Sequence, residues 1–359
     1  MDCPSLGGSV DRLAIIMLSA IGDSVHVLPV VNALKRADPQ LHITWVIQPV
    51  PHQLVKAHPA VDEFILFHRR RGARLLGGFA RTLGPLRRTR FDLVLGLQVY
   101  LKAGILLAAT RSKVKLGFDR ARARDLNWLF STHRIPAHAP QHVQDQYFEF
   151  LDFLGVDRRQ VEWGLTLTAE ERRAQQEFFA PLDKPVCAVV VATSRPEKNW
   201  QPERYARLLE FAEFDLGLQP VIVGGPSAVE RQAASEIQAS TRAHTVNALG
   251  DSVRRLLYLL DGSALVVSPD TGPLHIARAL DVPVVGLYGF TNPKRSGPYA
   301  KYQELVADGY ARFPGEDYPI SMQYRKNGMQ RVTVEMAAEK LELAKRTYVD
   351  QSGPRSSPS

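Results

Sequence analysis

The feature that most constrains the fold is a polar turn that stands between two short apolar runs. Residues 264–267 and 282–287 have the length and the apolar content of buried strands, and a segment with helical periodicity lies between them. Asp270-Thr-Gly272 forms the turn before that helix. Pro273 suits the first turn of a helix, where its missing N–H costs nothing. This order of strand, turn, helix and strand predicts a parallel α/β unit.

The same turn is a candidate phosphate site. A helix that begins at the carboxyl end of a strand presents free backbone N–H groups and the positive end of its dipole. Thr271 adds a hydroxyl, and Gly272 lets a ligand approach the backbone. His275 lies one turn into the helix and faces the same candidate site. Two alternatives stay open on these residues alone. One is an ordinary turn without a ligand. The other is the Asp-Thr-Gly triplet of aspartic proteases, which are all-β and fit the alternating context poorly.

The strand–helix alternation runs through the chain in two series. Predicted strands of the first series lie at 13–18, 42–48, 63–67, 92–97 and 113–117. The second series begins at 186–191 and continues through 220–223 to the turn described above. We therefore predict two α/β domains, 1–165 and 166–350, with a disordered tail at 351–359. Their parallel sheets are expected to face a central cleft, where open sheets bind ligands at their carboxyl edges.

Bulk composition narrows the class of protein. The chain has 359 residues and a formal net charge of +8, which predicts an acidic partner: nucleic acid, an anionic membrane surface or a phosphorylated substrate. Cys3 and Cys187 fit neither a metal site nor a disulfide framework, which is typical of a reducing compartment. No apolar run approaches the roughly 18–20 residues that span a bilayer, and no signal peptide is recognisable. We expect a cytosolic protein that can attach peripherally to a membrane.

A basic segment stands out in the first half. Residues 68–90 hold eight arginines and no acid, with leucines and Phe79 between them. A solvated helix face is one interpretation. We favour a surface for an anionic amphiphile or phosphosugar, because the guanidinium fork suits phosphate and carboxylate. Nucleic acid is not expected as a partner, because no nucleic-acid motif or base-stacking aromatic pattern accompanies the arginines.

Three further polar side chains follow predicted strands. Asp23, in the first strand–helix turn, is a candidate general base or a helix cap. Lys198, after the first strand of the second half, is a candidate for neutralising a pyrophosphate leaving group or a solvated loop lysine. Glu230, just past Gly-Gly-Pro226, could accept two ribose hydroxyls or be a first-turn helix acid. Taken together, these groups predict a nucleoside-diphosphate site in the second half, with a base facing it from the first. The lack of P-loop, dinucleotide, Asp-x-Asp and zinc spacings argues against P-loop chemistry, against a simple dehydrogenase and, less strongly, against a metal enzyme.

Three motifs in this order resemble those of the family 9 glycosyltransferases, the lipopolysaccharide heptosyltransferases. They are Ser19-Ala-Ile-Gly-Asp-Ser-Val-His-Val-Leu-Pro29, Thr193-Ser-Arg-Pro-Glu-Lys-Asn-Trp200, and Ser268-Pro-Asp-Thr-Gly-Pro-Leu-His275 running through to Tyr288-Gly-Phe-Thr-Asn-Pro293. The match extends over about residues 12–300. Gly117-Phe-Asp-Arg-Ala-Arg-Ala-Arg124, followed by Gln141-His142, is most similar to the heptosyltransferase I branch.

The resemblance implies a GT-B fold, with two Rossmann-like domains, and a metal-independent, inverting transfer from ADP-L-glycero-D-manno-heptose to a Kdo hydroxyl of Kdo-lipid A. It implies that Asp23 is the base and that Lys198, with Thr193 and Ser194, holds the diphosphate. The implied roles at the remaining positions are backbone contacts to phosphate by Thr271 and Gly272, sugar or phosphate contacts by Asp270 and His275, ribose binding by Glu230, and contacts to the anionic acceptor by Arg69, Arg70, Arg71 and Arg120.

The chain departs from the family pattern at a few positions beside the predicted site. Ser24-Val25 stands where Val-Leu is common, Phe290 where Pro or Ser is common, and Asn292 where Asp is frequent. These departures bear on which sugar is transferred more than on the reaction. Two other hypotheses remain: a family member of the heptosyltransferase II or III type with another acceptor or sugar, and a non-catalytic basic binder on a GT-B-like scaffold.

Overall fold

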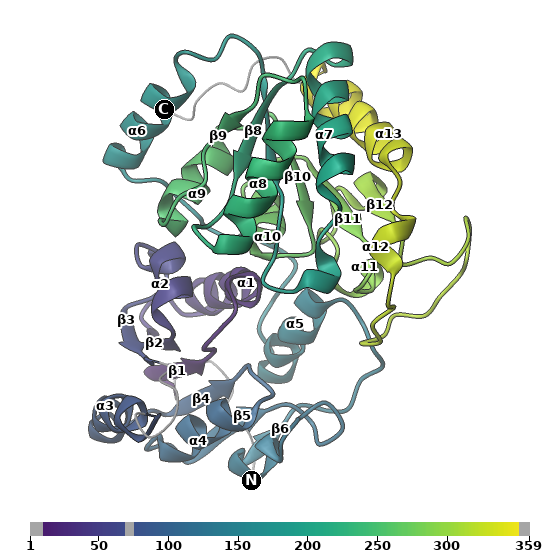
Figure 1. The fold of residues 1–359 in the computed structure, drawn as a ribbon. Helices are drawn as coiled ribbons and strands as arrows, with labels where there is room; N and C mark the ends of the chain where they lie inside the picture. Colours follow the sequence, from purple (N-terminus) through teal and green to yellow (C-terminus); the bar gives the residue numbers. More distant parts are fainter. Residues whose placement is uncertain (1–9, 69–74, 352–359) are drawn as a thin grey trace. The chain divides into compact units, whose positions relative to one another are not determined.

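The computed structural model describes residues 10–68 and 75–351, and the contacts within it divide the chain into two compact units (Figure 1). Unit 1 runs up to Ala139 and includes Val143–Thr166. Unit 2 comprises Pro140–His142 and the chain from Leu167 onward. The predicted tail beyond residue 351 and the arginines at 69–71 lie outside the described residues.

Unit 1 is built on a parallel sheet of six strands in the order β3-β2-β1-β4-β5-β6. Its strands are β1 (Arg12–Ile16), β2 (His42–Ile47), β3 (Glu63–Leu66), β4 (Leu93–Gly96), β5 (Val114–Gly117) and β6 (His133–Arg134). Its helices are α1 (Ile21–Ala37), α2 (Pro49–Val55), α3 (Leu75–Arg88), α4 (Leu101–Ala109), α5 (Val143–Leu154) and the 3-10 helix η2 (Asn127–Phe130). This order, 3-2-1-4-5-6, is that of a doubly wound nucleotide-binding fold.

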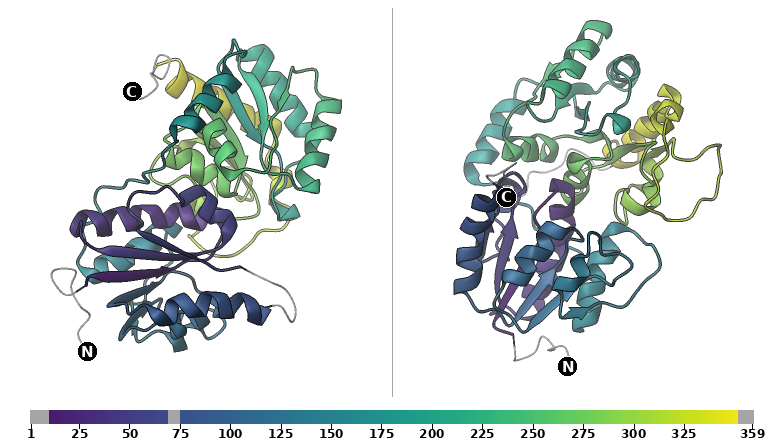
Figure 2. Two further views of the ribbon diagram at one scale, coloured as in Figure 1. Left: turned by 90° about the vertical axis from the view of Figure 1, so that its left-hand side faces the viewer. Right: turned by 60° about the horizontal axis from the view of Figure 1, so that its bottom comes forward.

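The central strand β1 shows why the unit folds this way. Leu13, Ala14, Ile15 and Ile16 are all fully buried, so both faces of the strand are covered, as in parallel sheets with helices on each side. Successive side chains of a strand point to opposite faces. Ala14 and Ile16 join a core cluster with residues of α3 and α4, while α1 lies on the face of the sheet opposite α3 (Figure 2).

Unit 2 repeats the architecture. Its strands pair in the order β12-β11-β10-β7-β8-β9, all parallel, which is the same winding as in unit 1. Its strands are β7 (Val186–Val190), β8 (Gln219–Val223), β9 (Val246–Asn247), β10 (Leu265–Pro269), β11 (Val284–Tyr288) and β12 (Val306–Asp308). Its helices are α6 (Ala169–Phe179), η3 (Pro196–Lys198), α7 (Pro202–Glu210), η4 (Phe211–Asp215), α8 (Ala228–Ser240), α9 (Val253–Asp261), α10 (Gly272–Ala279), α11 (Pro293–Ser296), η5 (Gln303–Leu305), α12 (Gly328–Arg331), α13 (Val334–Ala344) and η6 (Lys345–Val349).

The predicted α/β class with two parallel sheets is confirmed, and the differences lie at the sheet edges. Sequence reasoning did not find β6, β9 or β12, which are two or three residues long. A run that short carries no readable periodicity, and it becomes a strand only by pairing with a longer neighbour. The predicted helix over 25–36 also begins earlier in the structure, at Ile21, so Asp23 lies inside its first turn.

One close backbone contact in unit 2 predicts a large effect on stability. A Cβ on Gly289 would lie 2.2 Å from the carbonyl carbon of Gly328 and from the nitrogen of Met329, so backbone would have to move. Overpacking of this kind costs about 1–3 kcal/mol and at times more. We expect Gly289→Ala to lower the thermal unfolding midpoint of unit 2, followed by circular dichroism, by several degrees.

The matched control is Gly84→Ala in helix α3, where an added Cβ meets no atom within 4 Å. Alanine is favoured over glycine in a helix by roughly 0.5–1 kcal/mol, so this change is expected to leave stability unchanged or raise it slightly. Unfolding of Gly289→Ala at the wild-type temperature would contradict the contact between the two backbone segments.

Candidate active site

The strand order of unit 2 reverses between β7 and β10, which are direct neighbours in its sheet. In open α/β sheets the loops that leave the carboxyl ends of two such strands diverge and form a ligand crevice. The loop after β7 leads into η3 and ends with Lys198. The loop after β10 is Asp270-Thr271, and it opens α10. The candidate phosphate turn and the candidate lysine therefore meet at the predicted edge.

A buried carboxylate, Asp270, lies at the centre of this edge and is only 7% exposed. The Nζ atom of Lys198 donates to Oδ2 of Asp270 at 2.6 Å and to its backbone carbonyl at 3.0 Å. The hydroxyl of Thr291 donates to the same Oδ2 at 2.6 Å, and Nε2 of His275 lies 3.7 Å from Oδ1. The structure thus brings together three residues that the sequence singled out, and adds Thr291.

The electrostatics of this cluster favour a charged Asp270. Burial by itself raises the pKa of the carboxyl group, but the neighbouring His275 and Lys198 outweigh burial and hold the pKa well below its usual range. Burial and the negative charge of Asp270 together raise the pKa of the nearby Tyr288 phenol. That hydroxyl stays protonated and donates to the carbonyl of Ser296 at 2.6 Å. The carboxylate is therefore a fixed anion that orients donors around it.

The start of α10 supplies backbone donors beside this cluster. Thr271 is the N-cap residue, Gly272 and Pro273 begin the helix, and the Thr271 side chain makes no capping hydrogen bond. The first N–H groups of a helix have no partner within the helix and suit an anion. The start of α10 therefore has the backbone geometry on which the predicted phosphate site depends, and phosphate binding there stays a prediction.

Thr193 and Ser194, the two predicted residues before Lys198, differ in burial and in their contacts. Thr193 is buried, and its N–H donates to Oδ1 of Asn199 at 2.7 Å. Its hydroxyl donates to the carbonyl of Arg195 at 2.8 Å, so it braces its own loop. Ser194 is exposed at the tip of that loop. Asn199 was not predicted; its place directly after the candidate lysine was the signal that could have found it.

Glu230 occupies the alternative position that sequence reasoning left open, in the first turn of α8. Its Oε1 atom accepts from the N–H of Gly225 at 2.6 Å, and its Oε2 atom accepts from the hydroxyl of Ser227 at 2.6 Å. Both oxygens therefore brace the turn after β8 and cap the helix. A ribose that binds Glu230 would share these oxygens with the backbone.

In unit 1 the equivalent reversal lies between β1 and β4, and Asp23 follows β1. Its Oδ2 atom accepts from the N–H of Ala20 at 3.0 Å. Gln98, just after β4, accepts from the N–H of Leu18 at 3.2 Å and donates to the carbonyl of Ser19 at 2.5 Å. The loop that leads into α1, whose first turn carries Asp23, is thereby fixed from both strands. Sequence reasoning missed Gln98, which holds the loop before Asp23, although it too directly follows a predicted strand.

The predicted basic acceptor residues are only partly described. Arg120 is exposed after β5, and its guanidinium lies 4.6 Å from the ring centre of Trp128. The neighbouring Arg122 is instead ion-paired with Asp119 and with Glu149. Arg69, Arg70 and Arg71 lie outside the described residues. Within α3, Leu83 and Leu86 pack against the core of unit 1 and are not part of an exposed apolar surface.

Two searches of the described chain concern ligands and membranes. Among residues 10–68 and 75–351, no group of three or more His, Cys, Asp or Glu side chains is placed to hold a metal ion. Over the same residues, every helix is too short or too polar to cross a bilayer.

The chain is similar over most of its length to known proteins. The family model described as glycosyltransferase family 9 (heptosyltransferase) matches residues 80–322. The chain is 28% identical over 332 residues to the lipopolysaccharide core heptosyltransferase OpsX of Haemophilus influenzae, covering 90% of this chain and 94% of that protein. It is 27% identical over 303 residues to lipopolysaccharide heptosyltransferase 1 of Escherichia coli K12, covering 81% and 92%.

Solved structures show the same fold. A family 9 glycosyl transferase from Veillonella parvula has a TM-score of 0.79 at 22% identity, covering 95% of this chain and 99% of that one. E. coli heptosyltransferase WaaC with ADP-2-deoxy-2-fluoro heptose has a TM-score of 0.72 at 24% identity, covering 92% and 99%.

The buried pair predicts a pH-dependent loss of stability in Asp270→Asn. Breaking a buried pair costs about 3–5 kcal/mol, because Lys198 loses the charge that compensates its own. Since the pKa of Asp270 is lower in the folded protein than its ordinary value of about 3.9, the carboxylate stabilises the fold fully above that value. Its contribution is lost as the pH falls through that value toward the folded pKa.

We therefore expect the gap in unfolding midpoint between wild type and Asp270→Asn to be wide at pH 6 and to narrow toward pH 3. Asp317→Asn is the control, since Asp317 forms an exposed pair with Lys294 and its side chain is 98% accessible. Such surface pairs contribute about 0–1 kcal/mol. A gap for Asp270→Asn that stays constant with pH would contradict the charged state assigned to this carboxylate.

Proposed function

The chain belongs to glycosyltransferase family 9, the heptosyltransferases, and on that basis we propose that it transfers L-glycero-D-manno-heptose from ADP-heptose to a Kdo hydroxyl of Kdo-lipid A. The reaction inverts the anomeric carbon and needs no metal. The observation that carries the proposal is the Asp270–Lys198 pair beside the start of α10, because a lysine and helix N–H groups together suit a diphosphate.

The donor diphosphate binds at the carboxyl edge of the unit 2 sheet. Thr271 and Gly272 present backbone N–H groups to a phosphate, and Lys198 compensates the negative charge that develops on the departing ADP. His275, on the same helix, contacts the sugar or a phosphate. Ser194 lies at the exposed tip of the loop that Thr193 braces and contacts the diphosphate. The ribose binds near Glu230, beyond β8.

Asp270 is a positioning residue in this scheme. It accepts a hydrogen bond from Lys198 at 2.6 Å and holds the ammonium group at the mouth of the site. Thr291 supports the carboxylate from the loop that follows the neighbouring strand β11. Because the pair is already formed within unit 2, Lys198 is oriented before the donor arrives, and little side-chain entropy is lost on binding.

Asp23 is the general base that takes the proton of the acceptor hydroxyl. Gln98 fixes the loop before α1, and the Asp23 carboxylate accepts from the N–H of Ala20, so the carboxylate has a defined direction. As the sugar–phosphate bond breaks, the acceptor oxygen attacks the anomeric carbon from the opposite face. Its proton passes to Asp23, and ADP leaves as the anion that Lys198 stabilises.

The acceptor is an anionic glycolipid, and the exposed Arg120 meets its carboxylates or phosphates. Arg69, Arg70 and Arg71, which lie outside the described residues, are proposed to share this role. The acceptor's lipid part places the enzyme peripherally on the cytosolic face of the inner membrane.

Transfer is tested by incubating the full chain with ADP-heptose and Kdo-lipid A in the presence of EDTA, followed by mass spectrometry of the lipid. We expect a mass gain of one heptose with EDTA present, because in this proposal Lys198 and the first N–H groups of α10 compensate the charge of the diphosphate. If the lipid gains no mass but ADP binds tightly, the result would indicate a different acceptor, as in the heptosyltransferase II or III type. No gain and no ADP binding would favour a non-catalytic binder, and a gain lost only with EDTA would contradict metal independence.

Asp23→Asn tests the base. A positioned general base contributes about 100- to 10,000-fold, so kcat is expected to fall by that factor while ADP binding, measured by calorimetry, stays at the wild-type value. The matched control is Asp38→Asn at the opposite end of α1, where the side chain accepts from the N–H of Gln40. Full activity of Asp23→Asn would refute the assignment.

A further inference from the structure

The buried Asp270 is contacted by a short connection that follows β11 and leads into α11. The hydroxyl of Thr291 donates to Oδ2 of Asp270 at 2.6 Å. The hydroxyl of Ser296, at the end of α11, lies 3.5 Å from the same oxygen. Two hydroxyls of one connection therefore face one carboxylate oxygen, and their positions depend on what holds the connection in place.

Asn292 fixes the turn between those two hydroxyls. It is the N-cap residue of α11 and is only 2% exposed. Its Oδ1 atom accepts from the backbone N–H of Lys294 at 3.0 Å, and its backbone carbonyl accepts from the N–H of Ser296 at 3.2 Å. One residue thus holds both the start of the helix, directly after Thr291, and the backbone of Ser296.

The nitrogen of the Asn292 amide contacts a distant part of the chain. Its Nδ2 atom donates to the carbonyl of Pro319 at 2.8 Å. The contact with the N–H of Lys294 requires an acceptor and the contact with Pro319 requires a donor, and an amide side chain offers both at once. A carboxylate at this position could make only the first contact, and a methyl group could make neither.

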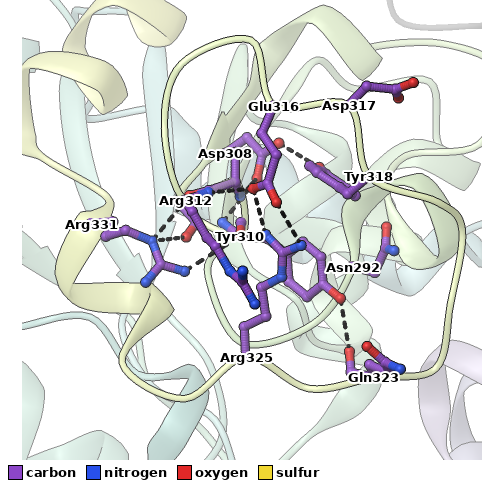
Figure 3. A network of polar contacts seen from close by, with 12 residues as sticks. Asn292, Asp308, Tyr310, Arg312, Glu316, Asp317, Tyr318, Gln323, Arg325 and Arg331 are labelled. Atoms are coloured by element: carbon purple, nitrogen blue, oxygen red, sulfur yellow. Dashed lines mark hydrogen bonds and ion pairs between the residues drawn. The ribbon is translucent and has the colours of Figure 1, made fainter.

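Pro319 belongs to the loop of residues 309–327, which is braced by its own side chains. Arg325 forms a bidentate ion pair with Glu316, at 2.7 and 3.0 Å (Figure 3). Its guanidinium also donates to the carbonyl of Tyr310 at 2.6 Å. Since a bidentate arginine–carboxylate pair has a defined geometry, the loop has a defined shape and offers the carbonyl of Pro319 at a fixed place.

The same loop also holds the residue before Thr291. The backbone N–H of Arg325 donates to the carbonyl of Phe290 at 3.0 Å. The ring of Phe290 stacks on the ring of Tyr324, with centres 4.7 Å apart and planes 7° apart. Thr291 therefore lies between two residues, Phe290 and Asn292, that are each hydrogen-bonded to this loop. These two contacts restrict the movement of the Thr291 hydroxyl away from the carboxylate.

We propose that Asn292 is a positioning residue for the donor site. By anchoring α11 to the loop at 309–327, it keeps the Thr291 hydroxyl on Asp270. Asp270 in turn holds the ammonium group of Lys198, which compensates the leaving diphosphate in the proposed function. The inference therefore rests on the proposed function and deepens it. Asn292 itself is assigned no contact with the substrate.

The first test is a double-mutant cycle on ADP affinity, measured by calorimetry with the full chain. Thr291→Val removes the hydroxyl and is expected to weaken ADP binding about tenfold, the scale of a lost hydrogen bond to a charged group. Asn292→Ala is expected to weaken it by a similar factor. Because both changes act on the same contact, the double variant should bind ADP within about twofold of Thr291→Val alone.

Two further variants separate this role from a general effect on stability. Thr168→Ala is the matched control, because Thr168 is also an N-cap residue of unit 2, and its side chain accepts from the N–H of Glu171 in α6. It is expected to lower the unfolding midpoint and to leave ADP affinity unchanged. Asn292→Asp keeps an acceptor for Lys294 but loses the donor to Pro319, so its ADP affinity is expected to lie between those of Asn292→Ala and wild type.

Several results would overturn the proposal. Losses that multiply to about a hundredfold in the double variant would show that Asn292 does not act through Thr291. Wild-type ADP affinity in Asn292→Ala or in Asn292→Asp, or an equal loss of affinity in Thr168→Ala, would refute the assigned role as well. The assay needs ADP alone, so it keeps its meaning if the transfer assay shows no heptose. A wild type that binds no ADP would overturn the donor site and this inference with it.

Turnover gives a second readout that a purely structural residue would not change. With saturating donor, Asn292→Ala is expected to lower kcat about tenfold and to leave KM for the acceptor at the wild-type value. The reason is that Lys198 acts on the leaving diphosphate and not on the acceptor. A raised acceptor KM with unchanged kcat would place Asn292 with the acceptor and would contradict the proposal.

Discussion

The candidate site depends on one buried negative charge. Asp270 is 7% exposed, and a carboxylate at that depth is tolerated only when cations and hydrogen-bond donors surround it. Lys198 and Thr291 supply them, each with an oxygen–donor distance of 2.6 Å. The same contacts that stabilise the carboxylate also fix the position of the lysine side chain. The ammonium group is therefore held beside the start of α10 by the fold itself.

The repeated winding of the two sheets explains where such sites arise. Each unit reverses its strand order once, between β1 and β4 and between β7 and β10. Loops from those strand pairs diverge, so polar side chains there lie beyond the apolar interior of the sheet. The strands still hold the backbones of these loops. Asp23 and Asp270 each follow one of these central strands. The proposed function uses this geometry, with Asp23 as the base and Lys198, held by Asp270, as the group that stabilises the leaving diphosphate.

Much of the architecture was predictable because apolar strands and polar turns have short-range signatures. The long central strands, the turn at Asp270 and the helix after it all follow from local patterns. Glu230 shows the limit of prediction from local sequence patterns. Its place after Gly-Gly-Pro226 was equally consistent with ribose binding and with a helix cap, and only the structure gives both carboxylate oxygens to Gly225 and Ser227. The short edge strands β6, β9 and β12 were not predicted for a related reason, because they form only by pairing with a neighbouring strand.

By itself, the sequence determined that the chain alternates strands and helices, that its central strands are buried on both faces, and which polar residues leave their carboxyl ends. These are properties of neighbouring residues and of hydrophobic periodicity. The tertiary structure decided which of those residues meet. Thr291 reaches Asp270 across 21 positions, Lys198 reaches it across 72, and Arg325 fastens Tyr324 beside Phe290. Such contacts depend on sheet order and loop path, which no local pattern encodes.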